Sequence, residues 1–123
     1  MKEIEKFGEF FVRNTRDQAL HNLNTLLSGA AKAPDQQSLQ RSLAEFSEEQ
    51  KQTIRELVDD LTTGMMHDLL YAFQEASDSE EGIIVQVDGK DIAQESDGLH
   101  GELFTEDGWI KRFSEYEYDE NKD

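Results

Sequence analysis

The chain has 123 residues, with 28 acidic and 12 basic side chains, a formal net charge of −16 and no cysteine. A chain of this length has room for one hydrophobic core, so we expect a single domain over residues 1–123. The lack of cysteine excludes disulfides, thiolate metal sites and cysteine nucleophiles. No apolar run approaches the roughly 20 residues that cross a bilayer, and the N-terminus lacks the apolar stretch of a signal peptide. We therefore expect a cytoplasmic protein that does not bind membranes.

The negative charge is concentrated in the second half of the chain. Residues 1–58 carry 9 acidic and 8 basic side chains, whereas residues 59–123 carry 19 acidic and 4 basic ones. Such an excess repels nucleic-acid phosphates and anionic membranes and attracts cationic partners. A surface that only improves solubility is the alternative explanation.

Two apolar stripes with helical spacing cover residues 2–28. The stripes consist of Ile4, Phe7, Phe10 and Phe11, and of Ala19, Leu20, Leu23, Leu26 and Leu27. Residues 13–16 interrupt the pattern, and Thr15 with Gln18 can restart the helix through a capping box. One continuous helix is the alternative. Gly29 fits the left-handed position that ends a helix.

The longest helical pattern covers residues 47–76. Residues 29–33 form a flexible connection before it, Pro34 starts a helical turn, and residues 35–46 form a short helix. The stripe of the long helix consists of Ile54, Leu57, Val58, Leu61, Met65, Leu69, Ala72 and Phe73. Ser47 and Gln50 have the spacing of a capping box at its start. The helical part thus spans residues 1–76.

After Gly82 the pattern changes to one typical of strands. Residues 83–87 and 90–94 flank Asp88-Gly89, a pair that favours a type I′ hairpin turn. Residues 99–105 and 109–113 are predicted as further strands of a meander over residues 82–113. Residues 114–123 form an acidic tail that we expect to fray. The predicted fold class is α+β, with N-terminal helices and one long central helix packed on a small C-terminal antiparallel β-meander.

His67 and His100 are the candidates for acid–base or metal chemistry. His100 and Glu102, two apart on a predicted strand, point the same way and can join His67 if the elements meet. A shared metal needs three or more convergent ligands, and the sequence has no ligand motif of known spacing. We therefore predict no catalytic residue, metal or cofactor, with a small metal-dependent hydrolase using His67 and His100 as an alternative.

The turns of the acidic half carry the candidate partner-binding residues. Carboxylates in such turns can stand in for phosphates toward a basic protein, and an aromatic residue beside them can act as an anchor. The candidates are Asp88, Asp91, Glu95, Asp97, Glu102, Glu106, Asp107, Trp109 and Tyr116. For Trp109, burial in the core is the alternative to a role in binding.

Part of this region resembles a known class of proteins. The runs SDGLHGELF (residues 96–104) and EDGWI (residues 106–110) are similar to the strand–turn–strand portion of small bacterial immunity-type proteins. This resemblance implies an intracellular binder that neutralises a toxin by covering a basic surface with carboxylates.

The predicted function is a non-enzymatic acidic binding or inhibitor protein that engages a basic protein partner and binds no nucleic acid directly. A structural module is a further alternative, with a homodimer formed through Phe7, Phe10 and Phe11 of the first helix. The apolar surface of that helix is large for a solvent-exposed face.

Overall fold

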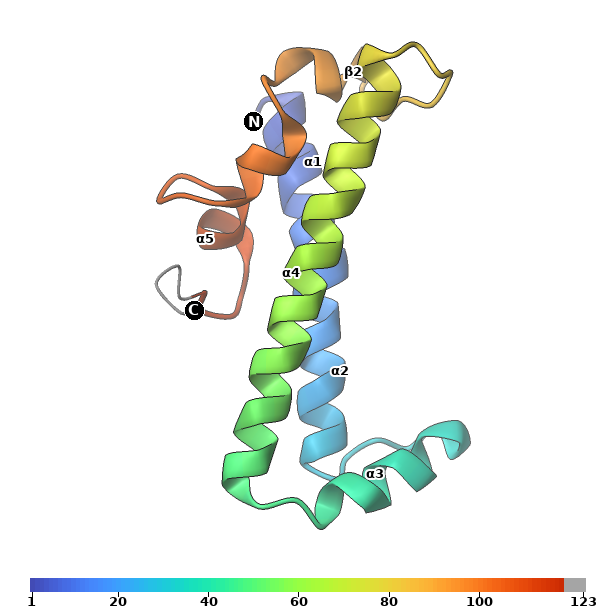
Figure 1. Cartoon of the computed structure of the whole chain (residues 1–123), viewed down its shortest axis with the longest axis vertical. Coiled ribbons are helices and arrows are strands. Elements are labelled where there is room, and N and C mark those ends of the chain that lie inside the picture. Colours follow the sequence, from blue (N-terminus) through green and yellow to red (C-terminus); the bar gives the residue numbers. More distant parts are fainter. Residues whose placement is uncertain (119–123) are drawn as a thin grey trace.

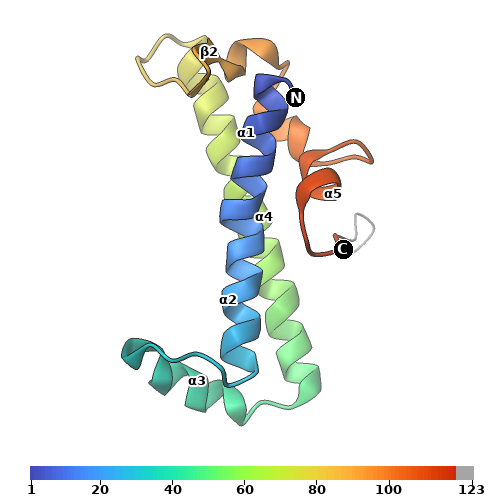
Figure 2. The same cartoon turned by 180° about the vertical axis from the view of Figure 1, so that it is seen from behind.

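The computed structural model describes residues 1–118 and is organised around two long antiparallel helical segments (Figures 1 and 2). The first segment comprises α1 (Glu3–Val12), the π-helical η1 (Arg13–Asp17) and α2 (Gln18–Leu27), and the second is α4 (Glu48–Asp78). The remaining elements are η2 (Pro34–Gln36), α3 (Gln37–Ala44), β1 (Gln86–Val87), β2 (Lys90–Asp91), η3 (Ile92–Glu95), η4 (Leu99–Leu103) and α5 (Trp109–Phe113). The predicted α+β class, with a long central helix and a small antiparallel sheet, is confirmed.

The long central helix begins as predicted. The backbone N–H of Gln50 donates to Ser47 Oγ at 3.1 Å, and the Ser47 N–H donates to Gln50 Oε1 at 2.8 Å, which completes the capping box. The helix ends two residues later than predicted. Glu80, just beyond the end, has a φ of 55°, the left-handed conformation that usually selects glycine.

The first segment is one continuous helix, so the restart predicted at Thr15 and Gln18 is wrong. The Thr15 hydroxyl donates to the Phe11 carbonyl at 2.6 Å instead of capping a new helix. The interruption at residues 13–16 corresponds to η1, whose wider π-helical turn shifts the stripe of α2 relative to that of α1 without a break in the helix. Gly29 closes α2 as predicted, with a φ of 78°.

The three- or four-stranded meander predicted over residues 82–113 is wrong, because the region forms one two-stranded hairpin followed by short helices. Strands β1 and β2 pair antiparallel with two residues each, and the turn at Asp88-Gly89 has the positive φ values, 51° and 84°, that were predicted. Leu99 and Leu103 are both buried, as are the adjacent Trp109 and Ile110. Adjacent residues of a strand point to opposite faces, so the burial of both Trp109 and Ile110 suits a helical turn better than a strand with one buried face.

The larger core lies between α1, α4 and the C-terminal elements. Its buried members are Phe7, Phe11, Val12, Met66, Leu70, Ile92, Ala93, Leu99, Leu103, Trp109 and Ile110. Trp109 lies directly on Gly8 of α1, where a Cβ atom would come within 2.5 Å of the indole ring. A smaller cluster of Leu23, Leu27 and Leu43 joins α2 to α3. Among residues 1–118, no helix is both long and apolar enough to cross a bilayer.

Candidate functional site

A buried arginine fixes the C-terminal segment to the helix pair. Arg16 in η1 is fully buried and bonds Asp59 of α4 in a bidentate arrangement, with Nε–Oδ1 and Nη2–Oδ2 distances of 2.9 and 3.2 Å. Its remaining N–H groups donate to Ser114 Oγ at 2.6 Å and to the carbonyls of Tyr116 and Glu117 at 2.7 and 2.8 Å. All five donors of the guanidinium are therefore used.

Asp17, the next residue, completes this clamp. Its carboxylate accepts hydrogen bonds from the Ser114 hydroxyl and, at 2.9 Å, from the Glu115 backbone N–H. Residues 114–117, which the sequence predicts to fray, are consequently held in place, and residues 119–123 of the predicted tail lie outside the described part. Tyr116 contributes its backbone to the clamp, and its side chain is half-buried.

The excess negative charge gathers at one end of the molecule. Residues 75–107 contain eleven acidic side chains and one basic side chain, Lys90. They form the end of α4, the hairpin, η3 and η4, which lie together at the end of the long axis opposite α3 (Figure 1). We call residues 75–107 the acidic end.

Three of the predicted binding carboxylates already have partners within the chain. Asp91 accepts from the Ser77 hydroxyl at 2.9 Å and from the Ala93 N–H at 3.0 Å, so it caps η3 and ties it to α4. Asp88 forms an ion pair with Lys6 at 3.0 Å, and Glu95 pairs with Lys90 at 3.7 Å. Both ion pairs are largely exposed, and pairs of this kind contribute little and exchange readily.

Two other predicted carboxylates influence each other. Burial raises the pKa of Glu102 above its usual range, and the negative charge of Asp97 raises this pKa further, while Arg112 opposes the shift. Asp97 is exposed. Glu102 therefore takes up a proton more readily than an unperturbed glutamate does, which weakens it as a candidate for a charged contact.

Some carboxylates of the acidic end are exposed without any bond that neutralises them. Within residues 1–118, no hydrogen bond or ion pair involves the side chains of Glu75, Glu80, Glu81, Glu106 and Asp107. Of these five residues, the sequence predicted Glu106 and Asp107. The other three lie on or directly after the last turns of α4 and were not among the predicted binding residues.

Trp109 is in the core, 2% exposed, with its ring 5.9 Å from that of Phe7, so it is unavailable as an anchor. The exposed large apolar residues of the acidic end are Ile83 and Ile84, at 57% and 48% exposure. Sequence reasoning missed them because residues 83–87 were assigned to a strand with one buried face. Their position directly after Glu80 and Glu81 is the signal that could have identified them.

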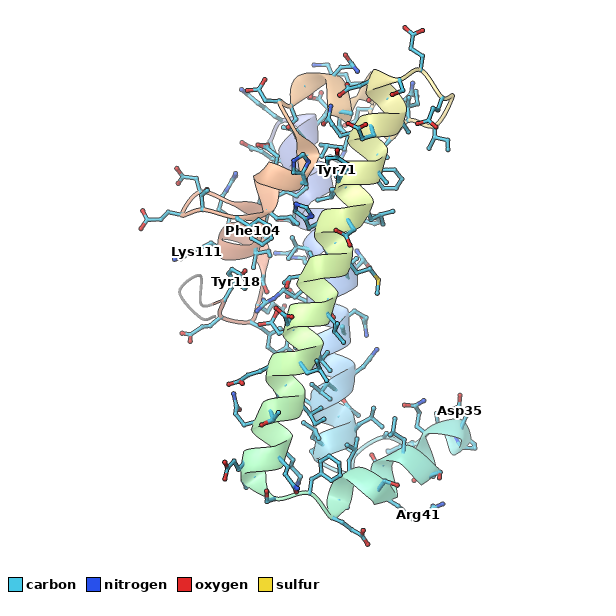
Figure 3. All side chains as sticks on the ribbon, in the orientation of Figure 1. Asp35, Arg41, Tyr71, Phe104, Lys111 and Tyr118 are labelled. Carbon is cyan, nitrogen blue, oxygen red and sulfur yellow. The ribbon has the colours of Figure 1, made fainter. Side chains whose placement is uncertain are left out.

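His67 and His100 do meet. Their ring centroids are 5.2 Å apart in an edge-to-face arrangement, and the Tyr71 ring lies 5.1 Å from His100. Figure 3 shows Tyr71 and Phe104 on the side of α4 that faces the C-terminal elements. Nδ1 of His100 is buried and has no hydrogen-bond partner, while Nδ1 of His67 lies 3.2 Å from the Asp68 carboxylate.

In the part of the chain that the structure describes, this histidine pair has no third ligand beside it. Within residues 1–118, no three His, Cys, Asp or Glu side chains are arranged to hold a metal ion. The expectation that Glu102 points the same way as His100 is wrong, because η4 is a 3₁₀-helix, in which residues two apart differ by about 240°. Catalytic zinc sites use three protein ligands, and the pair supplies two.

No protein-family model, curated protein or solved structure matches the chain. The fold and the charge distribution therefore define the protein only as an elongated α+β protein with an acidic end.

Proposed function

We propose that this chain is a non-enzymatic binding protein whose acidic end engages a basic protein partner. The observation that carries the proposal is the ratio of eleven acidic residues to one basic residue in residues 75–107, which run from the end of α4 through the hairpin, η3 and η4 to the loop before α5 (Figure 1). Self-repulsion among these carboxylates costs stability in the free protein, and a cationic surface relieves it. Neutralisation of a basic toxin, as the immunity-type resemblance implies, is one form of this proposal, and a cytoplasmic location belongs to it.

Ile83 and Ile84 supply the apolar contact that such an interface needs. Interfaces combine an apolar centre with a polar rim, and charges alone contribute more to the rate of association than to affinity. The two isoleucines lie beside Glu80 and Glu81, and Asp88 follows them at the hairpin turn. We therefore expect the acidic residues to steer the partner and the isoleucines to hold it.

Affinity capture with the full chain tests the proposal. The test variant carries Glu75→Gln, Glu81→Gln, Glu106→Gln and Asp107→Asn, all of them exposed and without partners in the described structure. We expect the wild-type chain to retain a basic protein that elutes as salt is raised, and the variant to lose it.

The matched control removes four negative charges from the opposite half of the molecule through Asp35→Asn, Glu45→Gln, Glu48→Gln and Glu49→Gln, all at exposed positions. It has the same net charge as the test variant and should retain the partner. Equal loss in both variants would show that only total charge matters, and equal retention would show that the acidic end is not the site.

The contact between His67 and His100 favours a second candidate, the metal-dependent hydrolase. Calorimetric titration with Zn²⁺ tests it, since two imidazoles and solvent would have to hold the ion. Zinc binding that disappears in His67→Gln and in His100→Gln, together with hydrolysis of a model ester, would support the enzyme. Heats no larger than those of dilution would exclude it.

A further inference from the structure

One side of the helix pair is apolar and uncovered. The exposed large residues there include Met65 at 70%, Phe10 at 64% and Leu61 at 60%. We call this surface the bare face and define it by Phe10 of α1 and by Leu57, Leu61, Met65, Leu69 and Ala72 of α4, all of them exposed. Large exposed patches of this kind are rare on monomeric proteins and usually mark interaction sites.

The bare face lies opposite the C-terminal elements. Gly8 of α1 contacts Trp109, and Phe10 follows it by two residues, about 200° around the helix. Likewise His67 of α4 faces Phe104, with 6.3 Å between ring centroids. Met65 precedes His67 by two residues, so it too lies about 200° around its helix from the covered side. Figures 1 and 2 agree that η4 and α5 cover one side of the pair, and the described chain places no element along the middle of the other.

The large apolar residues of α4 on this face are arranged symmetrically. Leu57, Leu61, Met65 and Leu69 follow one another at intervals of four residues, centred on position 63. When two copies of α4 pair antiparallel about this centre, Leu57 meets Leu69 and Leu61 meets Met65. A two-fold interface is self-complementary in this way, because residue i contacts j and j contacts i.

We propose that the bare face is the interface through which two copies of this chain pair, with α4 antiparallel to α4 of the second copy. The face extends about 22 Å along α4, from Leu57 to Ala72, and Phe10 adds to it from α1. Its five large apolar side chains are between 43% and 70% exposed, and pairing with a second copy removes them from water.

The charge distribution sets the direction of pairing. The residues that define the face are uncharged, and the exposed Asp68 lies within the same arc of α4, seven residues after Leu61. Antiparallel pairing places the two acidic ends about 45 Å apart, several times the screening length of about 8 Å at physiological salt. Parallel pairing would bring them side by side.

The sequence predicted a homodimer through the first helix, whereas the proposed dimer uses the bare face. Phe7 and Phe11 are 9% and 7% exposed and belong to the core, so Phe10 is the only one of the three phenylalanines available to a second copy. Most of the proposed surface lies on α4, and the acidic end is outside it. The dimer and the binding function can therefore fail independently.

Sedimentation equilibrium of the full chain tests the dimer. One chain has a mass of 14.1 kDa, and we expect twice this mass at micromolar concentrations. Met65→Glu places two carboxylates in an apolar interface and should give the single-chain mass with an unchanged circular dichroism spectrum. Leu39→Glu, on the 51% exposed Leu39 of α3, is the matched control and should remain dimeric.

The direction of pairing is tested by crosslinking, because the chain has no cysteine of its own. A mixture of the Leu57→Cys and Leu69→Cys variants should form disulfide-linked heterodimers, while each variant alone should not crosslink efficiently. Efficient crosslinking within each single variant would show parallel pairing. A single-chain mass for the wild type up to several hundred micromolar, or a dimer unaffected by Met65→Glu, would overturn the proposal.

Discussion

Replacement of Arg16 should lower the free energy of unfolding more than replacement of any other polar residue. The side chain is fully buried, and its five donors bond Asp59, Ser114 and two backbone carbonyls. Loss of one partner of a buried ion pair typically costs about 3–5 kcal/mol, because the groups left behind are desolvated. Domains of this size have a total free energy of unfolding of about 5–15 kcal/mol. Arg16→Met should therefore lower it by about 3–5 kcal/mol.

Arg16→Lys separates the charge from the geometry. Lysine keeps the positive charge but has three donors and no planar fork, so it cannot reproduce five bonds to two chain segments. We expect a loss of about 1–3 kcal/mol, intermediate between the wild type and Arg16→Met.

Urea unfolding followed by fluorescence measures these losses. Trp109 is the only tryptophan, is buried against α1 and lies five residues before Ser114, so it reports both global unfolding and release of the C-terminal segment. A double-mutant cycle with Ser114→Ala should show coupling above about 0.5 kcal/mol, because Arg16 donates to the Ser114 hydroxyl. A loss below about 1 kcal/mol in Arg16→Met, or additive effects in the cycle, would refute the clamp.

Three further changes have expected outcomes of definite sign, each measured by urea unfolding. Glu80→Gly should raise the free energy of unfolding by about 1 kcal/mol, because Glu80 occupies a left-handed conformation that glycine adopts without steric cost; unchanged stability would contradict this. Gly8→Ala should lower it by about 1–3 kcal/mol although alanine favours helices, because the new Cβ would overlap the ring of Trp109. Glu102→Gln should raise the free energy of unfolding at pH 7, because the raised pKa of Glu102 means that the folded state disfavours the charged form. This gain should disappear as the pH falls below about 4, because Glu102 is then protonated in the unfolded chain as well. A gain that persists at pH 3 would point to a cause other than ionisation.

Local signals in the sequence predicted the features that depend on near neighbours. The capping box at Ser47 and Gln50, the left-handed Gly29 and the turn at Asp88-Gly89 each involve contacts within a few residues, and all three are present. The extra strands failed because Leu99 and Leu103 are buried against α4, a contact between segments about 30 residues apart. Tertiary burial of this kind overrides a local preference for strand.

Sequence reasoning about the site failed for the same reason. It could count carboxylates and show that the acidic end is charged. It could not show that Asp91 caps η3, that Trp109 is covered by Gly8, or that Ile83 and Ile84 remain exposed, because each of these depends on packing between distant segments. The sequence could say only that His67 and His100 would come together if their elements met. They do so because η4 packs on α4.

The two proposals together lead to a consequence that neither has alone. An antiparallel dimer presents two acidic ends about 45 Å apart, so it can bind two sites of an oligomeric or surface-bound basic partner at once. Linked binding of this kind raises apparent affinity by about 10²- to 10⁴-fold without any new contact. Met65→Glu should therefore leave the affinity for a monomeric partner unchanged but speed dissociation from an immobilised one by at least tenfold. Equal effects on both would mean that Met65 contacts the partner directly, and that the bare face and the acidic end form one binding surface.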